Sequence, residues 1–167
     1  MPTAVDQEPM TPRFGTIGHS TISRLAPGAG SSFEPRRTAL TPAKKILVVD
    51  DDPDVREMVA ITVSNAGFRA DTAQDGEEGW KAICMTAYDL IITDHEMPRL
   101  TGLSLIKRIR EVSPEPPCIL ISGRLPEPES SLNGIIHSSA LLEKPFSPAA
   151  LIEKVYGILL YGDFTAF

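Results

Sequence analysis

The chain has 167 residues, of which 42% are hydrophobic and 23% charged, enough for one domain of ordinary size. Its formal net charge of −6 argues against direct binding to nucleic acid or an anionic membrane, because like charges repel. It has no run of about 18 apolar residues and no basic start followed by an apolar stretch, so we expect neither a transmembrane helix nor a secretory signal. Cys84 and Cys118 lie in apolar segments and are expected to be buried, reduced thiols of a cytoplasmic protein.

Residues 1–43 differ in composition from the rest of the chain. They contain six of the 15 prolines and four of the 12 glycines, with four arginines against three acidic residues. No apolar period runs through them, and their few large apolar side chains would not offset an ordering cost of about 1–2 kcal/mol per residue. We therefore expect a disordered arm, with a docking or targeting segment as the alternative. One folded domain over residues 44–162 and a short tail over residues 163–167 would follow.

The first part of that domain alternates between short apolar runs and amphipathic stretches. Residues 46–49 form a continuous apolar run, which is typical of a strand buried on both faces of a parallel sheet. Asp52 and Pro53 then supply the cap and the first-turn proline of a helix. The apolar face expected for that helix comprises Val55, Met58, Val59, Thr62 and Val63. A strand over residues 68–73 and a helix capped by Asp75 follow.

The same alternation continues to the end of the domain. The elements expected there are a buried strand over residues 90–94, a helix over 103–112, a buried strand over 118–122, a short strand over 140–143 and a last helix that starts at Pro148. Pro126 and Pro128 confine any helix before the last strand to about residues 130–137. The pattern predicts a (βα)5 fold, a doubly wound five-stranded parallel sheet with helices on both faces. We expect no second folded domain.

Polar side chains stand where the predicted strands end. Asp50 and Asp51 follow the first strand, Asp94 ends the third, Ser122 ends the fourth and Lys144 follows the fifth. The carboxyl ends of parallel strands share one edge of the sheet, where ligands bind, so these groups should converge. Carboxylates in close proximity repel, and a hard cation such as Mg²⁺ relieves that repulsion. The set suits phosphoryl transfer onto a carboxylate, with Asp94 as the nucleophile.

These segments resemble the receiver domain of two-component response regulators. The resemblance covers about residues 44–160 and rests on several short motifs in the same order and at compatible spacing. The motifs are Ile46-Leu47-Val48-Val49-Asp50-Asp51, Leu90-Ile91-Ile92-Thr93-Asp94 with Met97-Pro98 and Gly102 after it, Ile121-Ser122-Gly123, and Lys144-Pro145-Phe146. It implies the flavodoxin-like topology of receivers.

The resemblance implies a role for each acidic residue of the set. Asp94 would be the phosphoacceptor, modified by a sensor histidine kinase or a histidine phosphotransfer protein. Asp51 and Asp94 would bind Mg²⁺ directly, Asp50 would act through water, and Glu96 would offer its backbone carbonyl. Mn²⁺ could replace Mg²⁺ in such a site.

It also implies roles for the remaining polar residues. Ser122 and Lys144 would bind the phosphoryl group, and the Lys144–Pro145 peptide bond would be cis. Ser122 would move when Asp94 is modified, and the position of Leu141 would change with it. Receivers commonly have an aromatic residue where this chain has Leu141, so the switch would here use an aliphatic side chain without a polar tip.

Two further departures from the family concern the surface. The prolines shorten the fourth helix, which usually belongs to the output or dimer face, so the oligomeric state stays open. Glu96 and Arg124 each lie two residues beyond a site residue, and we expect them to pair across the mouth of the site. Such an exposed pair would contribute only about 0–1 kcal/mol, and its effect would be on the access of water to the acyl phosphate.

The leading interpretation is a stand-alone phosphorylation switch that signals in trans to an unknown output protein. It would be no enzyme beyond catalysing its own phosphorylation and dephosphorylation. The alternative is a receiver-like interaction module that works without phosphate, which Leu141 and the shortened helix favour. A hydrolase with an aspartyl-phosphate intermediate would need a second acid where Glu96 stands, but Met97-Pro98 and the lack of a cap domain argue against it. His95 is expected to be solvent-facing or packed, because its side chain should point away from that of Asp94.

Overall fold

Five parallel strands form one sheet with the order β2-β1-β3-β4-β5. In the computed structural model, the residues described are 43–113, 115–123 and 140–161. The strands are β1 (Lys45–Val49), β2 (Arg69–Ala73), β3 (Leu90–Asp94), β4 (Cys118–Ser122) and β5 (Leu141–Glu143). The helices are α1 (Pro53–Asn65), α2 (Gly76–Met85), α3 (Gly102–Val112) and α4 (Pro148–Tyr161). The predicted doubly wound parallel sheet is confirmed.

Several predicted features lie outside the described residues. They are most of the arm over residues 1–43, the tail over residues 163–167, the helix expected at 130–137 and the side chain of Arg124. None of the helices in the described ranges is long and apolar enough to cross a bilayer.

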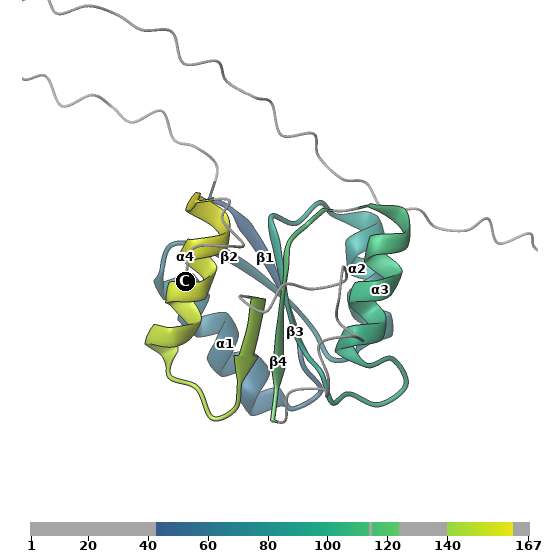
Figure 1. The fold of residues 1–167 in the computed structure, drawn as a ribbon, viewed down its shortest axis with the longest axis horizontal. Helices are drawn as coiled ribbons and strands as arrows, with labels where there is room; N and C mark the ends of the chain where they lie inside the picture. The colour runs from purple at the N-terminus through teal and green to yellow at the C-terminus, as the bar shows by residue number, and fades with distance from the viewer. Residues whose placement is uncertain (1–42, 114, 124–139, 162–167) are drawn as a thin grey trace, which may run out of the picture.

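The middle of the sheet is covered on both faces. Every residue of β3 and β4 is buried, as expected for strands sandwiched between helices. Figure 1 shows α2 and α3 on one face and α1 and α4 on the other. The core accordingly divides in two, one half between the sheet and α2 and α3, the other between the sheet and α1 and α4.

Side-chain caps start the helices at the carboxyl edge of the sheet. Asp52 accepts hydrogen bonds from the backbone N–H groups of Asp54 and Val55, and Asp75 accepts one from Glu78, so both predicted caps are confirmed. The buried face of α1 is narrower than the apolar face that the sequence predicts. Only Val59 and Val63 of that face are buried, whereas Met58 is 36% exposed.

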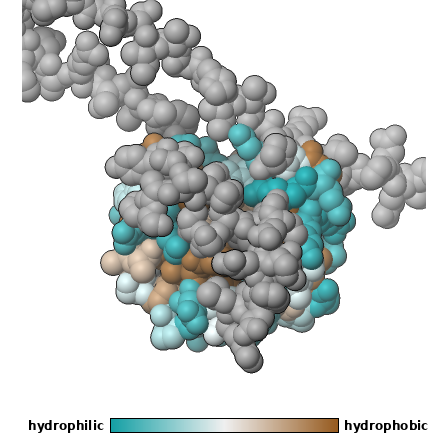
Figure 2. All heavy atoms as spheres, viewed as in Figure 1, coloured by the Kyte–Doolittle hydropathy of each residue, from teal (hydrophilic) through white to brown (hydrophobic). Residues whose placement is uncertain are grey.

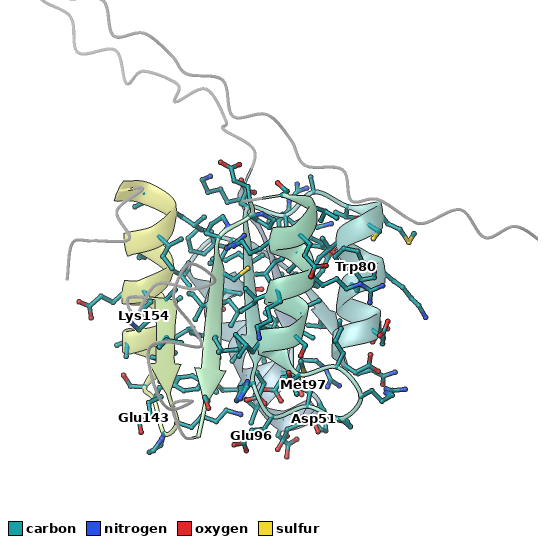
Figure 3. All side chains as sticks on the ribbon, turned by 45° about the vertical axis from the view of Figure 1, so that its right-hand side comes forward. Asp51, Trp80, Glu96, Met97, Glu143 and Lys154 are labelled. Carbon is teal, nitrogen blue, oxygen red and sulfur yellow. The ribbon has the colours of Figure 1, made fainter. Side chains whose placement is uncertain are left out.

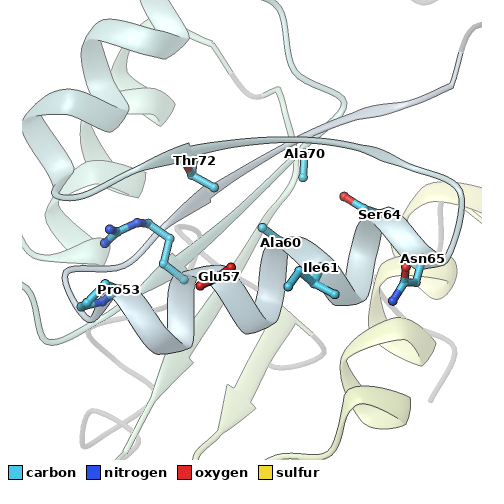
Figure 4. Close-up of a pocket in the computed structure, with 9 residues that line it drawn as sticks. Pro53, Glu57, Ala60, Ile61, Ser64, Asn65, Ala70 and Thr72 are labelled. Carbon is cyan, nitrogen blue, oxygen red and sulfur yellow. The ribbon is translucent and has the colours of Figure 1, made fainter.

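A shallow hollow of about 430 Å³ lies between α1 and the edge strand β2 (Figure 4). Small side chains line much of it, among them Ala60, Ser64, Ala70 and Thr72. None of the polar residues predicted to form a site faces this hollow. On the described surface in Figure 2, hydrophilic residues predominate over α3, and hydrophobic residues gather near β5 in the middle of the view.

The connection from β3 to α3 returns onto the end of its own strand. Gly102, the first residue of α3, donates its N–H to the carbonyl of His95 at 3.2 Å. A Cβ atom at Gly102 would overlap the carbonyl oxygen of Asp94 and would lie 2.9 Å from a methyl group of Leu120. Only glycine permits this approach, so Gly102 fixes the distance between α3 and the end of β3.

We predict that Gly102→Ala lowers the free energy of unfolding by about 1–3 kcal/mol, because the added methyl group forces backbone apart in a packed region. Urea denaturation measures the change. Gly123→Ala is the matched control, since a Cβ atom there would meet no atom of the described residues within 4 Å. Equal stability of the two variants would contradict the close approach.

Candidate functional site

The strand register brings four of the predicted residues to one edge of the sheet. Asp94 pairs with Ile121 in the ladder, so Ser122 stands one residue beyond it on the neighbouring strand. Asp50 directly follows β1, and Lys144 directly follows β5. Asp50, Asp94 and Ser122 are buried, which is uncommon for polar side chains unless they have partners.

Lys144 lies between two of the buried carboxylates. Its ammonium nitrogen is 2.6 Å from Oδ1 of Asp94 and 3.6 Å from Oδ2 of Asp50. The backbone of Lys144 is held at the end of β4, because its N–H donates to the carbonyl of Ser122 at 2.8 Å. The Lys144–Pro145 peptide bond is cis, as the resemblance implied. One cation therefore neutralises two carboxylates at the end of the sheet.

Backbone groups hold the two carboxylates in place. Oδ2 of Asp94 accepts a hydrogen bond from the Glu96 N–H at 2.6 Å, and Oδ1 of Asp50 accepts one from the Asp52 N–H at 2.9 Å. The guanidinium of Arg56 donates to the carbonyl of Asp50 at 2.7 Å and so ties the end of β1 to α1. Lys144 contacts one oxygen of Asp94 and the Glu96 N–H donates to the other, and a carboxylate oxygen has a second lone pair that can bind a further ligand.

The pKa values of the pair respond to this arrangement. Burial raises the pKa of the Asp50 carboxyl above its ordinary value, although the Asp52 N–H and the charge of Lys144 act in the opposite direction. Partial burial lowers the pKa of the Lys144 ammonium, but its contacts with Asp94 and Asp50 outweigh this effect, and the net pKa is raised. Lys144 is therefore charged at neutral pH.

One oxygen of the site has no hydrogen bond. Oδ2 of Asp50 is a buried side-chain oxygen without a hydrogen-bond donor in the described structure, and it faces the same space as Asp94 and Lys144. A buried carboxylate oxygen of this kind is a natural ligand for a hard cation or its water shell. Within the described ranges, no group of three or more His, Cys, Asp or Glu side chains gathers as a metal site. The donors fit Mg²⁺, which uses one or two carboxylates in proteins and keeps several waters.

The other predicted site residues occupy different settings. Asp51 and Glu96 are exposed, and Figure 3 shows both at the lower edge of the sheet, where the strand arrows point. Leu141 is half-buried beside Leu120 and packs against the core on the side of α2 and α3. The predicted pairing of Glu96 with Arg124 involves a residue outside the described part of the chain.

Sequence reasoning missed three features around the site. Arg56 reaches the end of β1, and Arg99 forms an ion pair with the buried Asp75. Nδ1 of the half-buried His95 is a buried atom without a hydrogen-bond partner in the described structure. Asp75 and Arg99 belong to different loops, so no short motif marks their contact, whereas Arg56 lies in α1 only six residues after Asp50. A possible signal for Asp75 was its place as a helix cap.

The geometry agrees with comparisons to known proteins. A family model described as the response regulator receiver domain matches residues 46–156. The transcriptional regulatory protein DltR of Streptococcus agalactiae is 30% identical over 112 residues, which cover 66% of this chain and 50% of DltR. The chain thus spans about half the length of the curated relatives it matches.

Solved receiver structures match at the level of fold and sequence. The response regulator TrrA of Thermotoga maritima, solved in complex with Mg²⁺-BeF, is 35% identical with a TM-score of 0.59, and the match covers 70% of this chain and 99% of TrrA. The chemotaxis protein CheY4 of Vibrio cholerae is 30% identical with a TM-score of 0.61, at 70% and 99% coverage. With the family model, the sheet order and the polar edge in agreement, the chain belongs to the response regulator receiver domain family of two-component signalling.

Proposed function

We propose that this receiver accepts a phosphoryl group on Asp94 in an Mg²⁺-dependent reaction and signals in trans to a partner protein. The donor would be a histidine of a sensor kinase or of a phosphotransfer protein. The observation that supports this most directly is the contact of the buried Asp94 carboxylate with Lys144, beside the Asp50 oxygen that has no hydrogen bond. Receivers are phosphoacceptor switches rather than conventional enzymes.

The proposed step would use Asp94 and the groups that lie beside it. An oxygen of Asp94 forms a bond to phosphorus while the bond from phosphorus to the donor nitrogen breaks, and the electron pair stays on that nitrogen. The Glu96 N–H holds the Asp94 carboxylate in one orientation, so little freedom is lost when the donor arrives. Lys144 and Ser122 would stabilise the oxygens of the transferred group.

Asp50, Asp51 and the backbone carbonyl of Glu96 would hold Mg²⁺ together with Asp94. When bound, the ion supplies positive charge to the phosphoryl oxygens and to the carboxylates around it. Asp50 is well suited to this task, because its orientation is fixed by the Asp52 N–H and its second oxygen accepts no hydrogen bond from the residues that the structure describes. Leu141 would respond to phosphorylation together with Ser122.

The intact mass of the protein after treatment with acetyl phosphate and Mg²⁺ tests the proposal. We expect a gain of one phosphoryl group that is lost in Asp94→Ala and on replacing Mg²⁺ by EDTA. Asp54→Ala is the control for loss of an acidic residue near the site, and it should retain the gain because Asp54 is exposed on α1. A gain that persists in Asp94→Ala would contradict the assigned nucleophile.

The mass measurement, combined with Trp80 fluorescence, distinguishes the proposed phosphorylation switch from the alternative function. Trp80 is buried on α2 and reports on its packing against α3, where Arg108 lies 4.4 Å from the ring centroid. An absent mass gain, together with no Mg²⁺-dependent change in Trp80 fluorescence on adding beryllium fluoride, would favour a receiver-like interaction module that works without phosphate.

A second prediction concerns Asp50 in the metal-free protein. Because its pKa is raised by folding, the folded state keeps the proton at pH values where the unfolded chain has lost it. The free energy of unfolding therefore falls as the pH rises from about 3.9 through the higher folded pKa. Asp50→Asn removes this loss, so we expect it to raise the free energy of unfolding at pH 7 and to change it little near about pH 3.5.

Urea denaturation in EDTA across this pH range measures the difference. Asp51→Asn is the matched control, since Asp51 is exposed and the same substitution there should leave stability unchanged within about 0.5 kcal/mol. An Asp50→Asn variant that is less stable than the wild type at pH 7 would show that the Asp50 charge stabilises the metal-free fold.

A further inference from the structure

The segment between β3 and α3, residues 95–101, holds part of the proposed site. Its first amide beyond His95, that of Glu96, donates to the Asp94 carboxylate at 2.6 Å. Its residue Met97 is 5% exposed and belongs to the core beneath α2 and α3. We call residues 95–101 the phosphoacceptor loop. A displacement of this loop moves the backbone of Glu96 and the orientation of Asp94 together.

The far side of the phosphoacceptor loop has an unusual backbone. Arg99 has φ 68°, a conformation that residues other than glycine, asparagine and aspartate seldom adopt. The Leu100 N–H bonds the Pro98 carbonyl at 2.8 Å and closes a three-residue γ-turn around Arg99. Strained residues persist where surrounding contacts hold them, so the contacts of this turn indicate what determines its shape.

Those contacts are made with the start of α2. Leu100 lies so close to Gly76 that a Cβ atom added to Gly76 would be 2.5 Å from the Leu100 carbonyl oxygen. The guanidinium of Arg99 forms an ion pair with Oδ2 of Asp75. The Asp75 side chain is 6% exposed, whereas that of Arg99 is 66% exposed, so the pair lies at the surface with its acidic member buried.

Asp75 is firmly held from the other side. Its Oδ1 accepts the Glu78 N–H at 2.8 Å, which is the cap of α2. The helix itself is anchored on the sheet, since Trp80 is buried and a Cβ atom at Gly79 would already press on Val49 at 3.0 Å. Arg99 therefore connects the phosphoacceptor loop to a rigid element through a buried carboxylate.

We propose that Asp75 and Arg99 are positioning residues for the phosphoacceptor site. Their ion pair holds the phosphoacceptor loop against α2 and thereby sets the orientation in which Asp94 and the Glu96 backbone meet a divalent cation. Neither residue touches the reacting atoms. The effect on cation binding rests on the proposed function, whereas the effect on the loop does not.

Substitutions that remove one charge of the pair at a time distinguish a role in positioning the loop from a purely electrostatic effect on cation binding. If only the field of the two charges matters, Asp75→Asn should weaken Mg²⁺ binding and Arg99→Gln should strengthen it. If the pair positions the loop, both substitutions should weaken binding, and the double variant should be no weaker than either single variant. Asn is itself a good helix cap, so Asp75→Asn keeps the cap of α2 while removing the charge.

The test combines two measurements on the full chain. Amide hydrogen exchange by NMR in EDTA compares Glu96 with Ile91, whose N–H bonds Pro117 inside the sheet at 3.0 Å and reports on global opening. Calorimetric titration with Mg²⁺ gives the dissociation constant. Controls are Arg99→Lys, which keeps the cation, and Glu77→Gln and Lys107→Gln, which change exposed charges on α2 and α3.

For Asp75→Asn and Arg99→Gln we expect Glu96 exchange and the Mg²⁺ dissociation constant each to rise about two- to fivefold, with Ile91 exchange unchanged. Arg99→Lys should lie close to the wild type, as should both surface controls. Wild-type exchange at Glu96 in both variants, or Mg²⁺ binding that tightens in Arg99→Gln, would overturn the proposal. A wild-type protein that binds no Mg²⁺ would refute the proposed function, while the exchange measurement would still decide whether the pair holds the loop.

Discussion

The arrangement of the polar edge of the sheet depends on the contact of one ammonium group with two buried carboxylates. Lys144 lies 2.6 Å from Asp94 and 3.6 Å from Asp50, at the edge of the sheet where both of these carboxylates are buried. Two carboxylates at such a place repel each other and lose hydration, and hydrogen-bond donors and positive charge reduce this cost. The lysine supplies one such charge. The oxygen of Asp50 that has no hydrogen-bond partner within the described residues would be a ligand position for the proposed Mg²⁺ or its water shell.

The rest of the fold serves to keep this edge in place. The carboxyl ends of parallel strands lie at the same edge of the sheet, so the Asp50 and Asp94 side chains come close together. The register of β3 and β4 is strongly specified, because both strands are fully buried and a shift would turn their apolar side chains away from the core. Gly102 allows α3 to pack closely against the end of β3, and the hydrogen bond from Arg56 to the Asp50 carbonyl connects α1 to the end of β1. The Asp94 carboxylate, the proposed phosphoacceptor, is held by a backbone N–H group as well as by a side chain, which suits the precise positioning that phosphoryl transfer would require.

The fold and most of the candidate site could be predicted from sequence because their signals are local. Apolar runs that end in Asp50, Asp94 and Ser122 specify buried strands with polar ends, and the topology of such a sheet then brings those ends together. Caps such as Asp52 and Asp75 were predictable for the same reason, since a cap is formed by neighbours in the chain.

Contacts between distant turns were not predictable in this way. The pairing of Asp75 with Arg99 joins two loops 24 residues apart, and Arg99 stands in a left-handed conformation that its side chain does not favour. The exposure of Met58 likewise depends on how α1 rests on the sheet, which the helical period alone does not determine. In each case the outcome follows from packing between segments rather than from the sequence of either one.

Titration of the wild-type protein with Mg²⁺, followed by NMR, tests the central claim most directly. If the edge built by Asp50, Asp94 and Lys144 is a cation site, the signals of these residues and of the Glu96 amide should shift along one saturable curve with a single equivalent of ion. Signals at the opposite edge, such as Asp89 beside Lys44, should stay in place. Shifts that do not saturate, or that spread over the acidic surface without a focus at Asp50 and Asp94, would contradict the account.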